Sequence, residues 1–219
     1  MILENLEKIQ KTIPSTVCLV AVSKTKPISD LQEIYDAGQR HFGENKVQEM
    51  TEKWEVLPKD IHWHQIGHLQ TNKVKFIAPY VHLIHSVDSL KLLAEINKQA
   101  EKCQRVIKVL LQFYIAKEES KYGLDYDEAK ELLASNDFKT FKNIQIIGVM
   151  GMASFTDDTS IVRKEFSQLK TIFTHIKTDF FPNDSSFKEV SMGMSGDYEL
   201  AIEKGSTMVR VGSSIFGGR

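Results

Sequence analysis

Lys24 lies at the end of one apolar segment, and a glycine-containing turn ends a second such segment near the other end of the chain. The first segment is VCLVAV (17–22), which stops at Ser23-Lys24, and the second is MVRVG (208–212). A lysine amine is a nucleophile that condenses with carbonyl groups, and the backbone N–H groups of such a turn can bind phosphate. A fold that brings the two segments together would hold one small molecule by an aldehyde and a phosphate.

A second turn with similar chemistry, SMGMSGD (191–197), precedes the last strand. The free N–H groups of the helix that it opens, and the Ser195 hydroxyl, favour an anion. After the last strand, Gly212 allows a close backbone approach and the Ser213 N–H can point at an anion. Arg210 shares a strand face with Gly212, and an inward guanidinium needs a partner. A lysine beside such turns meets the needs of pyridoxal 5′-phosphate (PLP), although both turns also fit ordinary strand-to-helix connections.

Alternation along the first strand decides where Lys24 points. Cys18, Val20, Val22 and Lys24 share one face of this strand. If that face lines a barrel, Lys24 projects inward at the carboxyl ends of the strands, where barrel enzymes hold their active sites. The alternative is a solvent-exposed lysine at a strand end.

The elements that would position these residues alternate, strand then helix, along the whole chain. The expected strands are residues 17–24, 40–43, 61–66, 81–85, 105–113, 144–150, 187–191 and 208–212. The expected helices are residues 1–12, 29–38, 45–54, 69–77, 88–103, 126–134, about 158–176 and 197–203. Ser29 or Asp30 is expected to cap the second helix, and residues 178–186 are expected to form an exposed loop. This pattern predicts a single α/β domain over 1–219, a (β/α)8 TIM barrel preceded by a short N-terminal helix; an open doubly wound sheet is the alternative.

Composition argues against several classes of protein. The 219 residues are 42% hydrophobic, and 28 basic and 29 acidic side chains leave a net charge of −1, so neither disorder nor a nucleic-acid partner is expected. The apolar stretch 144–155 is too short to span a membrane, and the N-terminus lacks the pattern of a secretion signal. Cys18 and Cys103 are expected to be reduced thiols, which favours a cytoplasmic protein.

Several motifs, taken together in their order along the chain, are highly specific. They are AVSKTKP (21–27), FGEN (42–45), HQIGHLQTNK (64–73), SKYG (120–123), SMGMS (191–195) and GSTMVRVG (205–212), continuing to 216–217. The chain resembles the PLP homeostasis protein family, whose members are single-barrel relatives of the fold-type III alanine racemase domain. The resemblance spans nearly the whole sequence.

The resemblance implies roles for individual residues. It implies that Lys24 holds PLP as a Schiff base, that Arg210 faces the pyridine nitrogen, and that Asn45 lies near the ring. Ser195 and the backbone amides of Gly212 and Ser213 would hold the phosphate.

Three positions depart from the usual pattern of the family. Lys46 stands where an aromatic residue is common, Gln65 where phenylalanine is expected, and Tyr114 where asparagine is frequent. The first two put the contacts around the ring in doubt, and Tyr114 those from the fifth strand. The lysine, the arginine and the phosphate turns are untouched by these departures.

Two features favour a protein that buffers or delivers PLP over an enzyme. A cationic Arg210 beside the pyridine nitrogen disfavours the pyridinium form, which makes the ring a poorer electron sink. The sequence stops soon after the last turn, so we expect neither the second domain of the racemases nor their dimer, but a monomer whose recipients are PLP-dependent apo-enzymes. The alternative is a fold-type III amino-acid racemase of low activity, with a second acid–base residue supplied by Tyr114, His41 or a partner subunit.

Histidines recur in the chain without a ligand pattern. His62 and His64 share a strand face and His68 follows, but no acidic or cysteine ligand accompanies them at a fixed spacing. We therefore expect no metal site, and we expect His41 and His85 to be polar residues at the mouth of the barrel.

Overall fold

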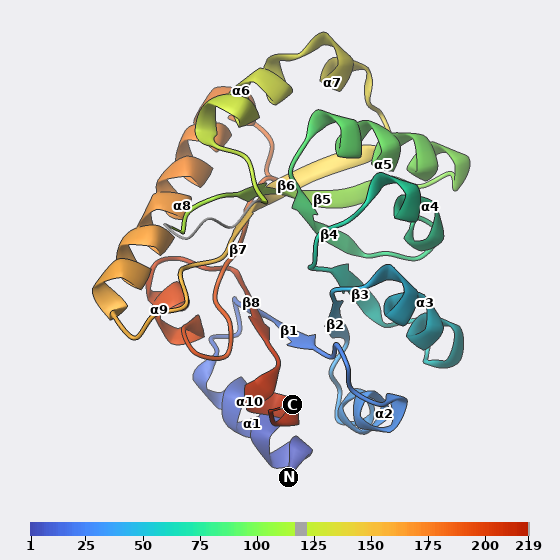
Figure 1. Ribbon diagram of the computed structural model, residues 1–219, viewed down its shortest axis with the longest axis vertical. Coiled ribbons are helices and arrows are strands. Elements are labelled where there is room, and N and C mark those ends of the chain that lie inside the picture. Colours follow the sequence, from blue (N-terminus) through green and yellow to red (C-terminus); the bar gives the residue numbers. More distant parts are fainter. Residues whose placement is uncertain (117–121, 219) are drawn as a thin grey trace.

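A computed structural model of the chain describes residues 1–116 and 122–218. Within them, eight parallel strands pair in sequence order and β8 pairs with β1, so that the sheet closes into a barrel (Figure 1). The strands are β1 (Cys18–Val22), β2 (His41–Glu44), β3 (His62–Gln65), β4 (Leu83–Val87), β5 (Ile107–Phe113), β6 (Ile144–Gly151), β7 (Glu189–Ser191) and β8 (Met208–Val211). The closed sheet confirms the expected (β/α)8 fold and rules out the open sheet.

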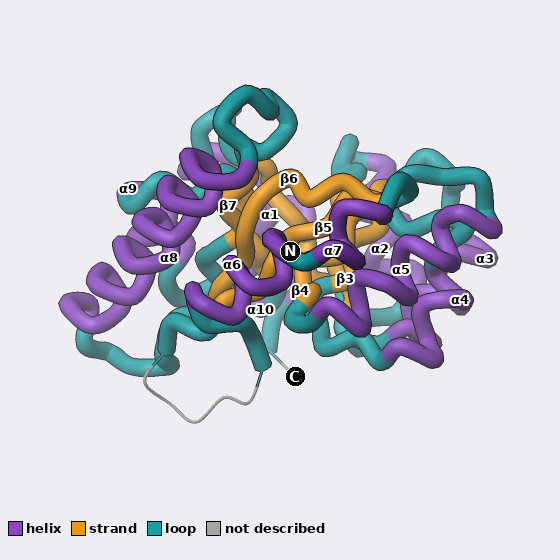
Figure 2. Tube along the Cα trace, turned by 90° about the horizontal axis from the view of Figure 1, so that it is seen from above, coloured by secondary structure: helices purple, strands orange, loops and turns teal. Residues whose placement is uncertain are grey.

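Helices follow the strands and surround the barrel (Figure 1, Figure 2). They are α1 (Ile2–Thr12), α2 (Ile28–Asp36), α3 (Val47–Val56), the 3-10 turn η1 (Thr71–Lys73), α4 (Val74–Ile77), α5 (Leu90–Lys102), α6 (Tyr126–Ala134), α7 (Asn136–Thr140), α8 (Thr159–Phe180), α9 (Tyr198–Glu203) and α10 (Ser213–Phe216). Among the described residues, none of these helices has both the length and the apolar character needed to cross a membrane.

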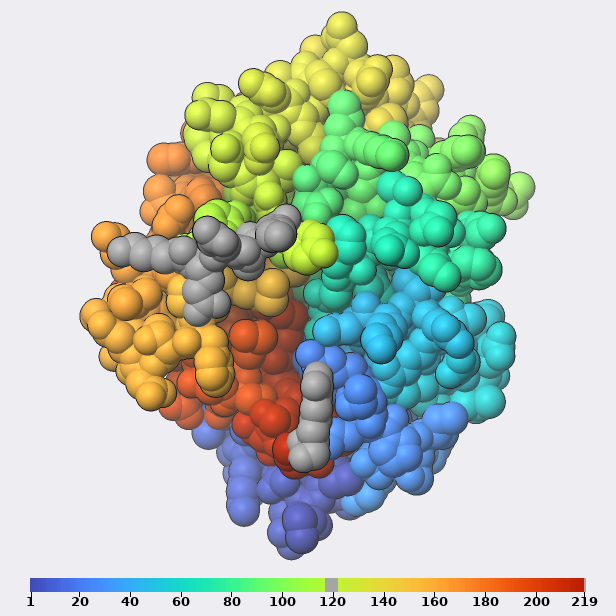
Figure 3. Space-filling model, viewed as in Figure 1, coloured from blue at the N-terminus to red at the C-terminus, as the bar shows by residue number. Residues whose placement is uncertain are grey.

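Pairing between β1 and β8 brings the two ends of the chain together. Val20 lies opposite Arg210, and Ala21 lies opposite Val211. Figure 3 shows the blue N-terminal and red C-terminal segments side by side on one face of the molecule. The helices that flank this pair also touch, because the Asn5 side-chain amide on α1 donates a hydrogen bond of 3.1 Å to the carbonyl of Ile215 on α10. The predicted convergence of the two segments is confirmed.

The apolar residues form two layers, one inside the barrel and one between the sheet and its helices. The inner cluster consists of Val20, Leu83, Leu110, Met150 and Met208, with Cys18 packed against it. Ala21 belongs to the outer layer, as strand alternation requires. The inward orientation predicted for the face of β1 that carries Val20 is therefore confirmed.

Two boundaries near Lys24 differ from the sequence expectation. β1 ends at Val22, because the chain then turns and the Lys26 N–H donates to the Ser23 carbonyl at 3.1 Å. Neither Ser29 nor Asp30 caps α2. This helix starts directly after Pro27, whose φ of −68° already suits a helix start, and it has no side-chain cap.

Other differences concern short helices and one loop. α8 continues to Phe180, so residues 178–180 are helical and the exposed loop is shorter than expected. The helix expected over 69–77 is a 3-10 turn followed by the short α4. The short helices α7 and α10 were not anticipated, because one turn of helix carries too little periodicity to be recognised in a sequence.

Replacing Val20 with alanine is expected to lower the free energy of unfolding by about 2 kcal/mol, because buried methyl groups are lost and a cavity remains. Val20 is fully buried inside the barrel. The matched control is Val56→Ala at the end of α3, where the side chain is 64% exposed. Its expected effect is below about 0.5 kcal/mol. Chemical denaturation measures both, and equal losses would show that Val20 is not a packing residue.

Candidate functional site

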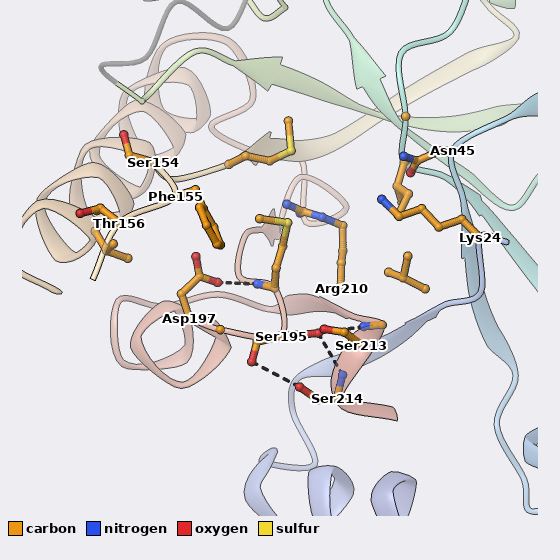
Figure 4. Close-up of a pocket in the computed structure, with 18 of the residues that line it drawn as sticks. Lys24, Asn45, Ser154, Phe155, Thr156, Ser195, Asp197, Arg210, Ser213 and Ser214 are labelled. Atoms are coloured by element: carbon orange, nitrogen blue, oxygen red, sulfur yellow. Dashed lines mark hydrogen bonds between the residues drawn. The ribbon is translucent and has the colours of Figure 1, made fainter. Parts of the chain in front are cut away.

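A cavity of about 770 Å³ opens at the carboxyl ends of the strands. The structure places in its lining the six residues that the sequence analysis assigned to the cofactor, namely Lys24, Asn45, Ser195, Arg210, Gly212 and Ser213 (Figure 4). Lys24 and Arg210 project into the same space, and the two turns that carry Ser195 and Ser213 lie below them in this view. Of the SKYG motif, Tyr122 lines the cavity, whereas Ser120 and Lys121 lie outside the described residues.

Buried charges fix the turn that carries Lys24. The Ser23 hydroxyl donates to Glu44 Oε1 at 2.6 Å, and the Ser23 carbonyl accepts from Lys53 Nζ at 2.7 Å. On the other side, the Thr25 N–H donates to Glu49 Oε1 at 2.5 Å. Both neighbours of Lys24 are therefore bound to carboxylates of β2 and α3, which restricts the backbone from which the lysine extends.

The centre of this network is an ion pair between Glu44 and Lys53. Lys53 Nζ lies 2.7 Å from Glu44 Oε1 and 2.8 Å from Glu49 Oε1, and the Glu44 side chain is fully buried. Burial raises the pKa of Glu44, while the positive charge of Lys53 and the hydrogen bonds from Lys53 and Ser23 oppose the rise. The sequence analysis did not identify Lys53. It follows Val47 and Met50 at helical spacing, so a lysine on the buried face of α3 could have indicated a buried ion pair.

Gln65 and Gly67 hold Asn45 against the end of β3. The Gln65 side-chain amide donates to the Asn45 carbonyl at 2.9 Å and to the Gly67 carbonyl at 3.1 Å. A Cβ at Gly67 would lie 2.6 Å from the Asn45 carbonyl oxygen, so only glycine permits this approach. Gln65 thus joins the loop that carries Asn45 to the loop that carries Gly67. Lys46 is exposed, and it lines a neighbouring pocket beside Lys24.

The two predicted anion turns meet at the Ser195 hydroxyl. Ser195 Oγ accepts hydrogen bonds from the backbone N–H groups of Gly212 at 3.1 Å and Ser214 at 3.4 Å. Gly212 packs closely on β1, because a Cβ there would lie 3.1 Å from the Val22 carbonyl oxygen. Amide donors and a hydroxyl therefore converge beside the cavity, from segments after β7 and β8.

Arg210 is a buried cation with a defined set of partners. Only 4% of it is exposed, and it donates to Ser191 Oγ at 2.5 Å and to the Gly151 carbonyl at 3.1 Å. Burial lowers its pKa to about 10, an effect that the charge of Asp197 opposes. Asp197 lines the cavity and accepts the Met194 N–H at 2.6 Å, so its carboxylate is oriented by the same turn that presents Ser195.

Histidines form a hydrogen-bonded column inside the barrel, beginning at the partner of Arg210. His85 Nδ1 lies 2.9 Å from Ser191 Oγ, His85 Nε2 lies 2.8 Å from His64 Nδ1, and His64 Nε2 lies 2.9 Å from His41 Nδ1. The expectation that His41 and His85 are mouth residues is wrong. His85 is fully buried in β4, and His41 begins β2, at the end of the barrel opposite the mouth.

Three comparisons place this geometry among known proteins. The family described as alanine racemase, N-terminal domain, matches residues 1–219. A pyridoxal phosphate homeostasis protein of Aquifex aeolicus is 37% identical over 98% of this chain and 95% of its own. The chain belongs to the pyridoxal phosphate homeostasis protein family, within the larger family of alanine racemase N-terminal domains. PipY of Synechococcus elongatus, solved with PLP bound, is 35% identical with a TM-score of 0.88, covering 99% of this chain and 100% of PipY.

Alanine racemases share the barrel at lower similarity. The enzyme of Bartonella henselae, solved with covalently bound pyridoxal phosphate, is 18% identical with a TM-score of 0.77. The match covers 99% of this chain and 58% of the racemase, and at this identity it shows the fold alone.

Part of the lining of this family member was not anticipated from the sequence. The loop after β6 contributes Ser154, whose N–H and hydroxyl donate to the buried Glu165 at 2.7 and 2.8 Å. A glutamate on the otherwise apolar face of α8 was the available signal. Tyr114 does not line the cavity. It is 37% exposed, and its N–H donates to the Leu124 carbonyl at 3.1 Å.

The variant Lys53→Ala is expected to lose about 3–5 kcal/mol of stability, because it leaves the buried Glu44 carboxylate without its cation. The matched control is Lys98→Ala on α5, which removes a pair with Glu95 from a lysine side chain that is 62% exposed. Its expected loss is below about 1 kcal/mol. Denaturant unfolding of both variants measures the difference.

The loss in Lys53→Ala is expected to shrink at acid pH relative to the unchanged protein. Burial already raises the folded-state pKa of Glu44, and removing Lys53 removes the largest opposing influence. A folded-state pKa above the unfolded value gives stability below the unfolded pKa that is lost as pH rises through the folded pKa. A deficit that instead grows toward acid pH would contradict this role for Glu44.

Proposed function

We propose that this protein binds PLP through Lys24 and takes part in its homeostasis inside the cell, by buffering the cofactor or delivering it. The observation that carries the proposal is the convergence of a lysine amine, a buried arginine and an amide-rich turn on one cavity of about 770 Å³. The chemistry of these donors fits an anionic aldehyde. The relatives named pyridoxal phosphate homeostasis protein, and PipY with PLP bound, support the same conclusion.

The residues divide the recognition of PLP between them. When bound, PLP supplies an aldehyde that condenses with a lysine amine, with loss of water, and a ring that can accept electron density. Lys24 provides the amine, and the Ser195 hydroxyl with the amides of Gly212 and Ser213 would provide donors for the phosphate, the Gly212 N–H giving up its bond to Ser195 Oγ. Asn45, held by Gln65, would lie near the ring.

Arg210 would control the charge state of the ring. It already has Ser191 and Gly151 as acceptors, and its guanidinium donates without accepting. A permanent donor and positive charge of this kind would keep a pyridine nitrogen beside it unprotonated. An unprotonated ring favours storage of the cofactor over chemistry at the amino-acid carbon.

A racemase would need a second acid–base residue near the substrate. His41 cannot serve from this chain, because it begins β2 at the opposite end of the barrel. Tyr114 lies outside the lining of the cavity. Neither residue considered from the sequence therefore supports the racemase alternative.

Recipients and location complete the proposal. An open cavity at the barrel mouth would allow transfer of PLP to PLP-dependent apo-enzymes, with the protein acting as a monomer. Cys18 and Cys103 are free thiols, which is consistent with work in the cytoplasm.

Borohydride reduction of the PLP-loaded protein, followed by peptide mass analysis, is expected to find the adduct on Lys24. The variant Lys24→Ala should lose the adduct and the visible absorbance while keeping its melting temperature, because Lys24 lies at the mouth and outside both apolar clusters. Lys73→Ala, in the exposed η1 turn, is the matched control and should label as the unchanged protein does. An adduct that persists in Lys24→Ala would refute the assignment.

Ser195→Ala is expected to weaken PLP binding roughly tenfold to a hundredfold, because a hydrogen bond to a charged group contributes about 1.5–3 kcal/mol. Pyridoxal, which lacks the phosphate, should bind the variant and the unchanged protein equally. The exposed Ser29→Ala is the control for the substitution itself. Titrations followed by absorbance measure all of these, and an equal loss for pyridoxal would place Ser195 away from the phosphate.

A further inference from the structure

The N-terminal ends of three adjacent strands each carry a histidine. His41 is the first residue of β2, His62 is the first of β3, and the two pair in the sheet register. His82 directly precedes β4, and its N–H donates to the Trp63 carbonyl at 2.9 Å, which continues the ladder between β3 and β4. These three side chains therefore gather at the end of the barrel opposite the Lys24 cavity.

The ring nitrogens of this trio have the spacing of metal ligands. One nitrogen from each histidine can be chosen so that all three lie within 4.8 Å of one another. His41 Nε2 and His62 Nδ1 are 3.3 Å apart. Two nitrogens bound to tetrahedral zinc at about 2.0–2.1 Å are separated by about 3.3 Å, the same spacing. The rings of His62 and His82 are stacked, with centroids 4.2 Å apart and planes 12° apart, so one of the two rings must rotate before both lone pairs can reach a shared ion.

A neutral imidazole offers one unprotonated ring nitrogen as a metal ligand. All three side chains are partly exposed, so an ion can reach them from solvent.

The ligand set selects among cations. Three uncharged imidazoles suit zinc, copper or nickel, whereas magnesium and calcium require oxygen ligands. Lys108 and Arg105 add positive charge near His82, which opposes the binding of every cation, so the affinity must come from the three imidazoles. Zinc accepts three histidines and leaves a fourth position for water.

The histidine column supplies the outer shell of such a site. His41 Nδ1 lies 2.9 Å from Nε2 of the fully buried His64, so a metal on His41 Nε2 would leave the other nitrogen hydrogen-bonded inside the barrel. Outer partners of this kind fix the tautomer and the orientation of a ligating histidine. The same column continues through His85 to Ser191, the partner of Arg210.

We propose that His41, His62 and His82 form a binding site for a borderline divalent transition metal, zinc first among them, at the N-terminal end of the barrel. The metal joins β2, β3 and the start of β4, and its position opposite the mouth assigns it to stability rather than to the chemistry of Lys24. This site departs from the sequence expectation of no metal. The set His62, His64 and His68 weighed there is dispersed, since His64 lies inside the column and His68 lines the mouth cavity.

The test is a titration of the chelator-treated full-length protein with Co²⁺, followed by displacement with Zn²⁺. The expected result is one Co²⁺ per chain with the visible bands of a tetrahedral ion and without a thiolate charge-transfer band, since Cys18 and Cys103 are not ligands. His62→Ala and His82→Asn should each weaken binding at least tenfold. His175→Ala, an exposed histidine on α8, is the matched control and should bind as the unchanged protein does.

Thermal unfolding keeps the proposal testable if one variant folds poorly. Zn²⁺ should raise the melting temperature of the unchanged protein and of Lys24→Ala, but not that of His82→Asn. Because Lys24→Ala cannot hold PLP in the proposed way, a metal signal that persists there separates this site from the proposed function. Absence of Co²⁺ binding by the unchanged protein, equal binding by His62→Ala, or a thiolate band would overturn the proposal.

Discussion

Closure of the barrel between its first and last strands is the constraint on which the site depends. The register that sets Val20 opposite Arg210 places the turn after β1 beside the turn after β8. Lys24 and the amides around Gly212 lie almost 190 residues apart in sequence, and they share a cavity because eight strands complete one circuit. Parallel strands direct all of their carboxyl ends to the same face, so a single closure assembles donors from several segments.

A buried guanidinium imposes the second constraint. Arg210 has left water almost completely, and desolvation of a charge is costly unless hydrogen bonds replace the lost solvation. Ser191 and the Gly151 carbonyl accept its donors, and Asp197 supplies opposite charge nearby. Ser191 also contacts His85, the end of the histidine column that lies nearer the mouth. A chain of hydrogen-bonded polar side chains therefore runs through the barrel from Arg210 at the mouth toward the opposite end.

The ion pair of Glu44 and Lys53 serves geometry more than stability. Burying two charges costs about as much as their attraction returns, so such a pair is weak evidence for a stable fold. Its effect here is directional, because it binds the backbone of Ser23, and Glu49 binds that of Thr25. A lysine held between two fixed residues presents its amine to the cavity from a defined position.

The sequence by itself determined the alternation of strands and helices, the inward face of β1 and the chemistry of the residues that meet at the mouth. Periodicity and turn composition are local properties, and Lys24, Ser195 and Gly212 each stand in a locally recognisable segment. Only the tertiary structure decided which polar side chains share a buried network. The histidine column joins residues of separate strands, whereas Lys53 and Glu165 bind groups on neighbouring segments, Glu44 and Ser154. In each case the fold sets the distance between the groups, and spacing along the chain does not encode it. The mouth was predictable because parallel strands share a direction, whereas the interior depends on register and packing that only the closed barrel fixes.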